Sequence, residues 1–308
     1  HGSVTQTKMP PAIPARFTLF EEADLVIALG ASLNSFTMGE GKVLFPNAKI
    51  ARVSTALDEV HDGAVPDMEV SGDANDVLGR VISRIEELDY ANQGFRTAET
   101  AQKLSAKPPE LRSPGDGVDP RDAMGILSRC LPAETHVSCG IGHYFSFPVS
   151  YLALPLGGSM DISHEFGAIG SGLPMSFGAC IAQPSRPHLL IEGDGSLMQH
   201  LQELETIVRY GKQMVVLVMN DGGYGAEVHK FRSVGGTGAI AQWESPDFVP
   251  IAKAMGGDGV TLTDLSEFED AARKGLAQGG LFLIDLRISP TTAHERYEHA
   301  FFGKNQLH

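Results

Sequence analysis

Short apolar runs and amphipathic stretches alternate along the chain. In the first third, runs at residues 24–30, 48–54 and 68–72 predict three strands. They are followed by residues 74–88, whose apolar positions recur at helical spacing and predict a helix. The predicted strands are apolar at most positions, as is typical of strands with both faces covered by helices. This region therefore predicts an α/β unit with a parallel sheet.

A second α/β pattern begins near residue 119. Asp119 is a predicted helix cap, and Pro120 is a good first helical residue. The predicted strands here are 135–140, 189–194, 214–220 and 281–289, and the predicted helices are 121–131, 143–154, 171–183, 197–210, 249–255 and 265–277. Strands that alternate with helices at this spacing predict a doubly wound parallel sheet. The segment 103–118 is rich in proline and glycine and is predicted to be a linker, so the expected units are 1–102 and 119–308.

Composition and charge narrow the classes of function. The net charge of −14 disfavours binding to nucleic acid. The chain has only three cysteines, and such a small, odd number does not form a disulfide framework. The sequence contains no apolar run long enough to span a bilayer, and its first residues do not resemble a signal peptide. We therefore expect a cytoplasmic protein that does not associate with membranes.

The residues that indicate chemistry follow two apolar strands. Gly193-Asp194-Gly195 follows one, and Asn220-Asp221-Gly222-Gly223 follows the next, 26 residues after Asp194. One strand-helix-strand crossover fits this spacing, and the carboxyl ends of parallel strands meet at one edge of a sheet. We therefore expect Asp194 and Asn220 to be neighbours. Either motif alone is a common turn, and the pair is the specific signal.

The pair has the composition of a magnesium and phosphate site. Asp194, the amide oxygen of Asn220 and the carbonyl of Gly222 are hard oxygen ligands, and Mg²⁺ completes such partial sets with phosphate and water. Gly195 and Ser196 begin the next predicted helix, whose amino end favours an anion. The residues alone therefore predict a diphosphate bridged by a metal ion.

This stretch resembles the thiamine diphosphate motif of the acetolactate synthase and pyruvate decarboxylase family. Residues 120–152 and 165–182 are similar to other parts of that family's diphosphate-binding domain, and residues 21–60 with 70–81 resemble the second half of its middle domain. The resemblance extends over residues 17–286. It implies an α/β fold in which a partial, Rossmann-like middle domain precedes a doubly wound diphosphate-binding domain.

The resemblance also implies roles for individual residues. Asp194, Asn220 and Gly222 would hold Mg²⁺, and Ile169 would bend the cofactor from below. Tyr224, Glu227 and His229 would face the substrate, with Glu227 as a candidate catalytic residue. The residues implied to bind the cofactor are Gly142, His143, Tyr144, Gly167, Ala168, Ile169, Gly193, Asp194, Gly195, Ser196, Asn220, Gly222, Gly223, Tyr224 and Gly225. Synthases commonly have Gln-His where this chain has His143-Tyr144.

The implied reaction is decarboxylation or carboligation of a 2-oxo acid, as in acetolactate synthase, with thiamine diphosphate and Mg²⁺. In the family, a glutamate on a separate pyrimidine-binding domain activates the cofactor, and this sequence contains no counterpart of that domain. We therefore expect a glutamate-bearing partner chain or domain within a homo- or hetero-oligomer. FAD binds the middle domain of some synthases, and the sequence does not decide whether it binds here.

Two alternative functions stay open from the sequence, and a third is disfavoured. One is a lyase related to benzoylformate decarboxylase, benzaldehyde lyase or oxalyl-CoA decarboxylase, because the sequence after Asn220 differs from the usual synthase loop. Another is a non-catalytic module that binds thiamine diphosphate. A nicotinamide-dependent Rossmann enzyme is disfavoured, because no GxGxxG follows the first strand of either region and GAIGSG follows the polar stretch DISHEF, which is not a predicted strand.

Overall fold

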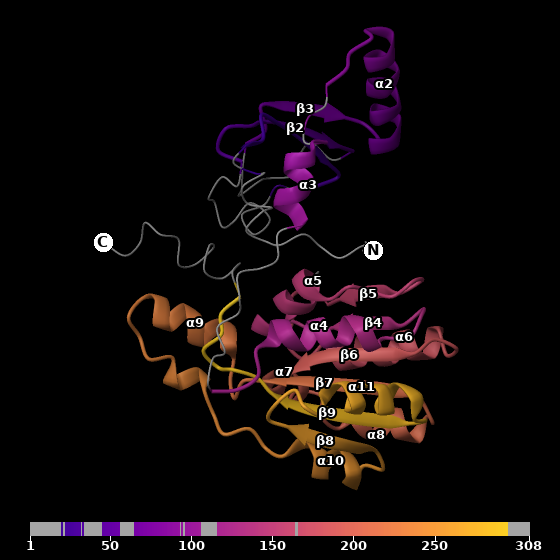
Figure 1. Cartoon of the computed structure of the whole chain (residues 1–308), viewed down its shortest axis with the longest axis vertical. Helices are drawn as coiled ribbons and strands as arrows, with labels where there is room; N and C mark the ends of the chain where they lie inside the picture. The colour runs from indigo at the N-terminus through magenta and orange to yellow at the C-terminus, as the bar shows by residue number, and fades with distance from the viewer. Residues whose placement is uncertain are drawn as a thin grey trace. The chain divides into compact units, whose positions relative to one another are not determined.

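The computed structural model describes residues 20, 22–31, 33, 45–55, 65–92, 94, 96–105, 116–163 and 166–294. These residues form two compact units, one within residues 11–109 and the other within residues 110–308 (Figure 1). The boundary falls inside the predicted linker, of which residues 106–115 lie outside the described residues, as does Glu165. No described helix is long and apolar enough to cross a membrane.

The smaller unit is a three-stranded parallel sheet with two helices. The strands run in the order β1-β2-β3, and all three predicted strands are confirmed. The predicted helix is also confirmed and becomes α2, where Asp73 caps the amino end by accepting hydrogen bonds from the backbone N–H groups of Asn75 and Asp76. The elements are β1 (Leu25–Leu29), β2 (Lys49–Ser54), β3 (Met68–Ser71), α2 (Ala74–Glu87) and α3 (Ala98–Ser105).

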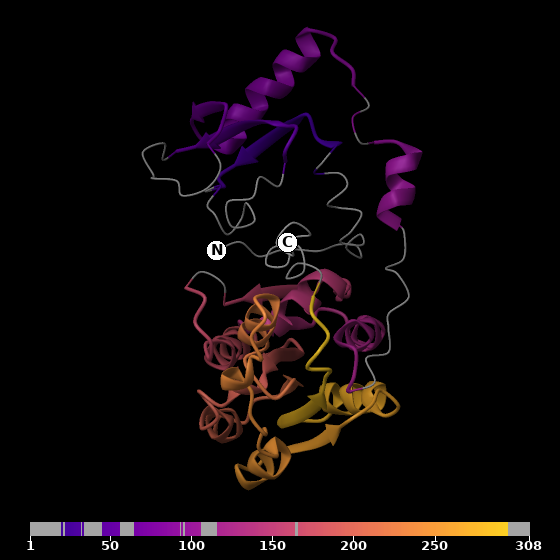
Figure 2. The same cartoon turned by 90° about the vertical axis from the view of Figure 1, so that its left-hand side faces the viewer.

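The larger unit is built on a six-stranded parallel sheet in the order β5-β4-β6-β7-β9-β8 (Figures 1 and 2). This arrangement confirms the predicted doubly wound α/β fold. Its strands are β4 (His136–Cys139), β5 (Ser159–Ile162), β6 (His188–Gly193), β7 (Met214–Asn220), β8 (Asp258–Leu262) and β9 (Leu281–Arg287). Its helices are α4 (Pro120–Cys130), η1 (His143–Phe145), α5 (Ser146–Tyr151), α6 (Gly172–Ala182), α7 (Asp194–Leu197), α8 (Glu203–Arg209), α9 (Gly225–Ser233), η2 (Ala239–Ala241), α10 (Phe248–Ala254) and α11 (Phe268–Ala277).

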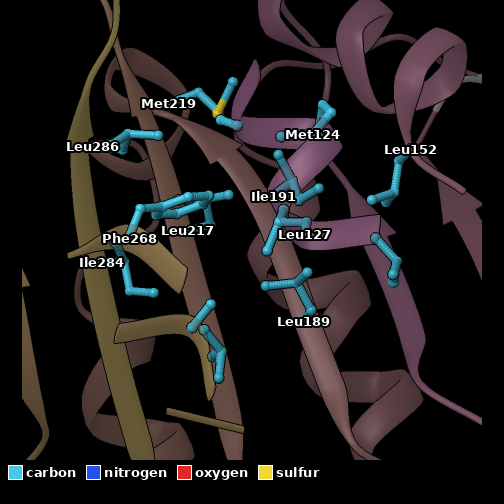
Figure 3. Packing of buried hydrophobic residues seen from close by; sticks show 14 of the residues in the cluster. Met124, Leu127, Leu152, Leu189, Ile191, Leu217, Met219, Phe268, Ile284 and Leu286 are labelled. Carbon is cyan, nitrogen blue, oxygen red and sulfur yellow. The ribbon is translucent and has the colours of Figure 1, made fainter. Parts of the chain in front are cut away.

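Helices cover both faces of this sheet. Side chains alternate along each strand, so Leu217 packs with α4, α5 and α11 on one face while its neighbours Val216 and Val218 pack with α6, α8 and α10 on the other. Figure 3 shows the first face, where Leu127 from α4 and Phe268 from α11 lie against the central strands. Every residue of β6 and β7 is buried. The central strands are therefore a rigid base for the loops at their carboxyl ends.

Strand β8 was not predicted, and three further sequence predictions need correction. Of the single helix predicted over residues 197–210, only α8 forms, because α7 ends at Leu197 and i→i+3 hydrogen bonds such as His200 N–H to Leu197 C=O interrupt the α-helical pattern after it. The helix predicted over 143–154 is η1 followed by α5 and ends at Tyr151. The polar stretch judged not to be a strand includes the end of β5, which tolerates Asp161 because it is an edge strand with one neighbour.

Candidate functional site

A pocket lies where the strand order reverses between β4 and β6. Chain connections leave β4 toward β5 on one side and continue from β6 toward β7 on the other, and ligands in open α/β sheets bind outside the carboxyl ends at such a point. Gly193 pairs with Met219, so Asp194 and Asn220 begin the turns of adjacent strands, as predicted. The pocket is thus built from the turns after β4, β6 and β7.

Most of the predicted site residues line this pocket. They are Gly142, His143, Tyr144, Ile169, Gly193, Asp194, Gly195, Ser196, Gly223, Tyr224, Gly225 and Glu227. Ile141, Asp221 and Ala226 also line it and were not predicted. Gly167, Ala168, Asn220 and Gly222 do not line it, and neither does His229. The enclosed part of the pocket measures about 20 Å³, which is room for an ion or a water molecule.

Two carboxylates lie together in the pocket, Asp194 buried and Asp221 half-buried. Asp194 is 1% exposed, and its Oδ1 has no hydrogen-bond partner among the described residues. Burial, together with the Asp194 carboxylate, raises the pKa of Asp221 well above its ordinary value. Burial also raises the pKa of Asp194. Adjacent buried carboxylates repel each other unless a proton or a cation lies between them, so this pair is suited to a cation.

The atoms predicted from Asn220 and Gly222 have other partners. The Asn220 side chain donates to Asp285 Oδ1 at 2.9 Å and accepts from the Gly222 N–H at 3.3 Å. The Gly222 carbonyl accepts from the Trp243 N–H at 2.9 Å. The structure therefore favours Asp221 over Asn220 as the side chain that faces the pocket from the turn after β7. The sequence signal for Asp221 was its place in the same NDGG motif.

Gly223 lies between two backbone hydrogen bonds that join its neighbours to residues 241–243, and it takes part in neither bond. It forms an antiparallel bridge with Gln242, in which Trp243 N–H bonds Gly222 C=O and Tyr224 N–H bonds Ala241 C=O. The Gly223 N–H and C=O stay outside this pair of bonds. A Cβ at Gly223 would lie 2.5 Å from the Ala241 carbonyl oxygen, so a residue with a side chain does not fit here without a shift. Gly223 also lines the pocket, where it presents only its backbone.

Ser196 fixes the loop that carries Ile169. Its hydroxyl accepts a hydrogen bond from the Gly170 N–H at 2.8 Å. Ser196 lies inside the single turn of α7, and no side chain caps that turn. The predicted role of Ser196 at the amino end of a long helix is therefore corrected, because the long helix is absent. Its hydroxyl instead holds Ile169, which is half-buried, at the wall of the pocket.

His143 is a neutral imidazole with a defined tautomer. Its Nε2 accepts a hydrogen bond from the His294 backbone N–H at 3.1 Å, so in the neutral ring the proton lies on Nδ1. Burial, with smaller contributions from His229 and His294, lowers the pKa of His143 well below its ordinary value. The His143 and His229 rings lie 4.5 Å apart between centroids. His143 therefore offers the pocket a hydrogen-bond donor without a charge.

Tyr144 is turned toward the sheet and bonds a buried carboxyl group. Its hydroxyl donates to Glu192 Oε1. Burial raises the pKa of Glu192 to about 7. A Cβ at Gly193 would lie 2.6 Å from the Tyr144 ring, which therefore packs directly against the backbone of the Asp194 turn. No role was predicted for Glu192, although a carboxyl group within the apolar run before Asp194 is an unusual feature of the sequence that indicates a buried, functional side chain.

The comparisons with known proteins agree with this geometry. Residues 140–286 match the model of the thiamine pyrophosphate enzyme, C-terminal TPP binding domain. The chain is 26% identical over 276 residues to the acetolactate synthase isozyme 1 large subunit of Escherichia coli (strain K12), covering 88% of this chain and 48% of that protein. It is 25% identical over 294 residues to the acetolactate synthase of Arthrospira platensis, covering 94% and 50% respectively.

A relative named for a different activity is also similar. The chain is 28% identical over 299 residues to the sulfoacetaldehyde acetyltransferase of Alcaligenes xylosoxydans xylosoxydans, covering 85% of this chain and 48% of that protein. The chain thus spans about half the length of the curated relatives it matches. The TPP binding domain is thus matched over the pocket, and the relatives matched over most of the chain support a thiamine pyrophosphate-dependent enzyme.

Proposed function

We propose that the larger unit binds the diphosphate of thiamine diphosphate through Mg²⁺ held by Asp194, Asp221 and the Gly223 carbonyl. The observation that carries this proposal is the pair of adjacent carboxylates, Asp194 buried and Asp221 half-buried, at the point where the strand order reverses. Among the described residues, no three His, Cys, Asp or Glu side chains form a complete metal cage. A partial set is what Mg²⁺ uses when phosphate oxygens and water supply its remaining ligands.

The residues around the pair fit a diphosphate group. Gly193 and Gly195 bring the backbone to the edge of the pocket without a side chain in the way. His143 adds a neutral donor, and no Lys or Arg of the described residues lines the pocket. The metal ion would therefore supply the positive charge that the diphosphate requires, since the two carboxylates alone would repel it. This ligand set replaces the predicted Asn220 and Gly222 with their neighbours.

The proposed reaction is decarboxylation or carboligation of a 2-oxo acid, which the acetolactate synthase relatives support. When bound, the cofactor supplies the electron sink for loss of carbon dioxide. Glu227 and Ile169 both line the pocket, and we propose that Glu227 gives or takes a proton at the substrate while Ile169 supports the cofactor. We also propose, from the family resemblance, that a glutamate-bearing pyrimidine-binding domain completes the site.

Calorimetry with thiamine diphosphate tests the metal site. Wild-type chain is expected to bind the cofactor with Mg²⁺ and not with EDTA. Asp194→Ala and Asp221→Ala are each expected to weaken this binding by 10-fold or more, because each removes a charged oxygen ligand. Asp264→Ala, at an exposed carboxylate on the same unit, is the matched control. Full binding by Asp221→Ala, with loss of binding by Asn220→Ala, would restore the ligand set predicted from the sequence.

The reaction is tested separately by release of carbon dioxide from pyruvate. The chain is assayed alone and with a pyrimidine-binding domain added as a second polypeptide. We expect turnover only in the mixture. Turnover by the chain alone would contradict the need for a partner, and tight cofactor binding without turnover in the mixture would favour the non-catalytic module.

A further inference from the structure

The segment 241–245 pairs with the turn that holds the proposed metal ligands. Tyr224 N–H donates to the Ala241 carbonyl, and Trp243 N–H donates to the Gly222 carbonyl, each at 2.9 Å. These two hydrogen bonds thus fix residues 222–224, which follow β7, against the segment 241–245. The segment comes from a different part of the sequence from every residue that lines the pocket. Neither the sequence pattern nor the family match assigned it a role.

Ser245 fixes one oxygen of Asp194. Its hydroxyl donates to Asp194 Oδ2 at 2.6 Å. The other oxygen, Oδ1, is fully buried and has no hydrogen-bond partner among the described residues. A carboxylate can rotate about its Cβ–Cγ bond, so a hydrogen bond to one oxygen determines where the other points. Ser245 thereby leaves Oδ1 as the oxygen that remains for a cation.

Trp243 packs the same segment against the turn after β6. A Cβ at Gly195 would lie 2.9 Å from Cη2 and Cζ2 of the Trp243 ring and 2.7 Å from Cε1 of Tyr224. The Trp243 and Tyr224 rings meet edge to face, with centroids 4.8 Å apart. The position of Ser245 next to Asp194 is therefore supported by a packed aromatic pair. Trp243 is also the only tryptophan of the 308-residue chain, so its emission reports on this place alone.

We propose that Ser245 is a positioning residue for the cation, acting through Asp194. The inference rests on the proposed function, since Asp194 must be a ligand for its orientation to matter. Residues that hydrogen-bond a metal ligand keep it in the binding orientation, and their loss typically weakens metal affinity about 10- to 100-fold. Loss of the Ser245 hydroxyl is expected to act on metal affinity in this range.

The test is a titration of the full chain with Mn²⁺ at saturating thiamine diphosphate. Free Mn²⁺ is followed by electron paramagnetic resonance, and Trp243 emission is followed in parallel. Ser245→Ala is expected to raise the half-saturating Mn²⁺ concentration about 10- to 100-fold. Ser245→Thr, which keeps a hydroxyl, is expected to recover most of that loss. Ser266→Ala removes an exposed hydroxyl that bonds Asp264 and is expected to match wild type.

The other possible outcomes contradict either the positioning role of Ser245 or the proposed function. If Ser245→Ala binds Mn²⁺ as wild type does, the positioning role is overturned while the proposed function stands. If wild type binds no Mn²⁺ with the cofactor, both are overturned. A purely structural role would lower the urea midpoint of Ser245→Ala and leave its Mn²⁺ affinity unchanged. Should Ser245→Ala fail to fold, Ser245→Cys decides, because its weak thiol donor occupies almost the same volume and must still lower the affinity.

Discussion

The two units use the same pattern of apolar strands and bury it to different extents. In the larger unit, every residue of β7 is buried, and Leu217 is 0% exposed. In the smaller unit, Ile27 of β1 is 47% exposed, and α2 has no buried residue although Ile82 and Ile85 lie on its apolar face. An apolar run therefore indicates a strand, whereas its burial depends on how many layers pack around it. The pocket lies in the unit whose sheet is covered on both faces.

Removal of one apolar side chain from each sheet is the strongest test of this difference. Leu217→Ala leaves a cavity between packed layers and is expected to cost about 2–5 kcal/mol of unfolding free energy. Ile27→Ala is expected to cost about 1 kcal/mol or less, because water already reaches that side chain. Hydrogen exchange measured by mass spectrometry reads each unit through its own peptides. Equal costs would show that β1 is covered in solution.

The pH dependence of stability should also separate the two units. Burial, with a smaller contribution from Arg232, lowers the pKa of His229 from 6.5 to about 4. The unfolded chain takes up this proton near pH 6.5, while the folded chain does so only near pH 4. The stabilisation is therefore complete above pH 6.5 and is lost as the pH falls through this window. Between pH 7.5 and pH 5 the larger unit is expected to lose about 2 kcal/mol from this group.

The smaller unit contains one histidine, His61, which lies outside the described residues, so the smaller unit of a His61→Gln chain serves as the internal reference. Its hydrogen exchange, corrected for the intrinsic rate, is expected to stay level over the same pH range. In the larger unit, His229→Gln is expected to reduce the dependence by the share that His229 contributes. An unchanged slope in this variant would show that other buried histidines, such as His143, carry the effect.

Two glycine substitutions give the smallest expected effects, with opposite signs. Gly79 lies inside α2, and a Cβ there meets nothing within 4 Å, so Gly79→Ala should stabilise the smaller unit by about 1 kcal/mol through helix propensity. Gly275 lies inside α11, where a Cβ would be 2.6 Å from Phe282 Cδ1. Gly275→Ala should destabilise the larger unit by about 1 kcal/mol, because overpacking outweighs the same gain in propensity. Thermal unfolding measures both, and a matching sign would contradict the difference in packing.

Local patterns in the sequence predicted much of the fold. The strand at Met214–Asn220 was predicted with its observed bounds, and Asp119 caps α4 as expected. The prediction was wrong where tertiary contacts override local preference. Edge strand β5 was missed because it contains polar residues, which an edge strand tolerates since it has only one neighbouring strand. The break between α7 and α8 was missed because apolar residues continue at helical spacing across it.

The sequence also predicted which turns form the site and not which atoms face it. Two motifs at the ends of adjacent strands were enough to place Asp194 beside the turn after β7. Choosing between Asn220 and its neighbour Asp221 required the structure, because successive side chains at the end of a strand point to opposite sides. Asn220 turns to Asp285 on β9, which leaves Asp221 to face the pocket.

The sequence by itself determined the parallel α/β fold of the larger unit, the family resemblance and the edge of the sheet where the site lies. These follow from periodicity and motif spacing, which are local properties of the chain. Only the tertiary structure decided that Ser245 holds Asp194, that Trp243 packs on Gly195 and that Glu192 bonds Tyr144. Each of these contacts joins residues about 50 positions apart that no local pattern connects, and packing alone brings them together.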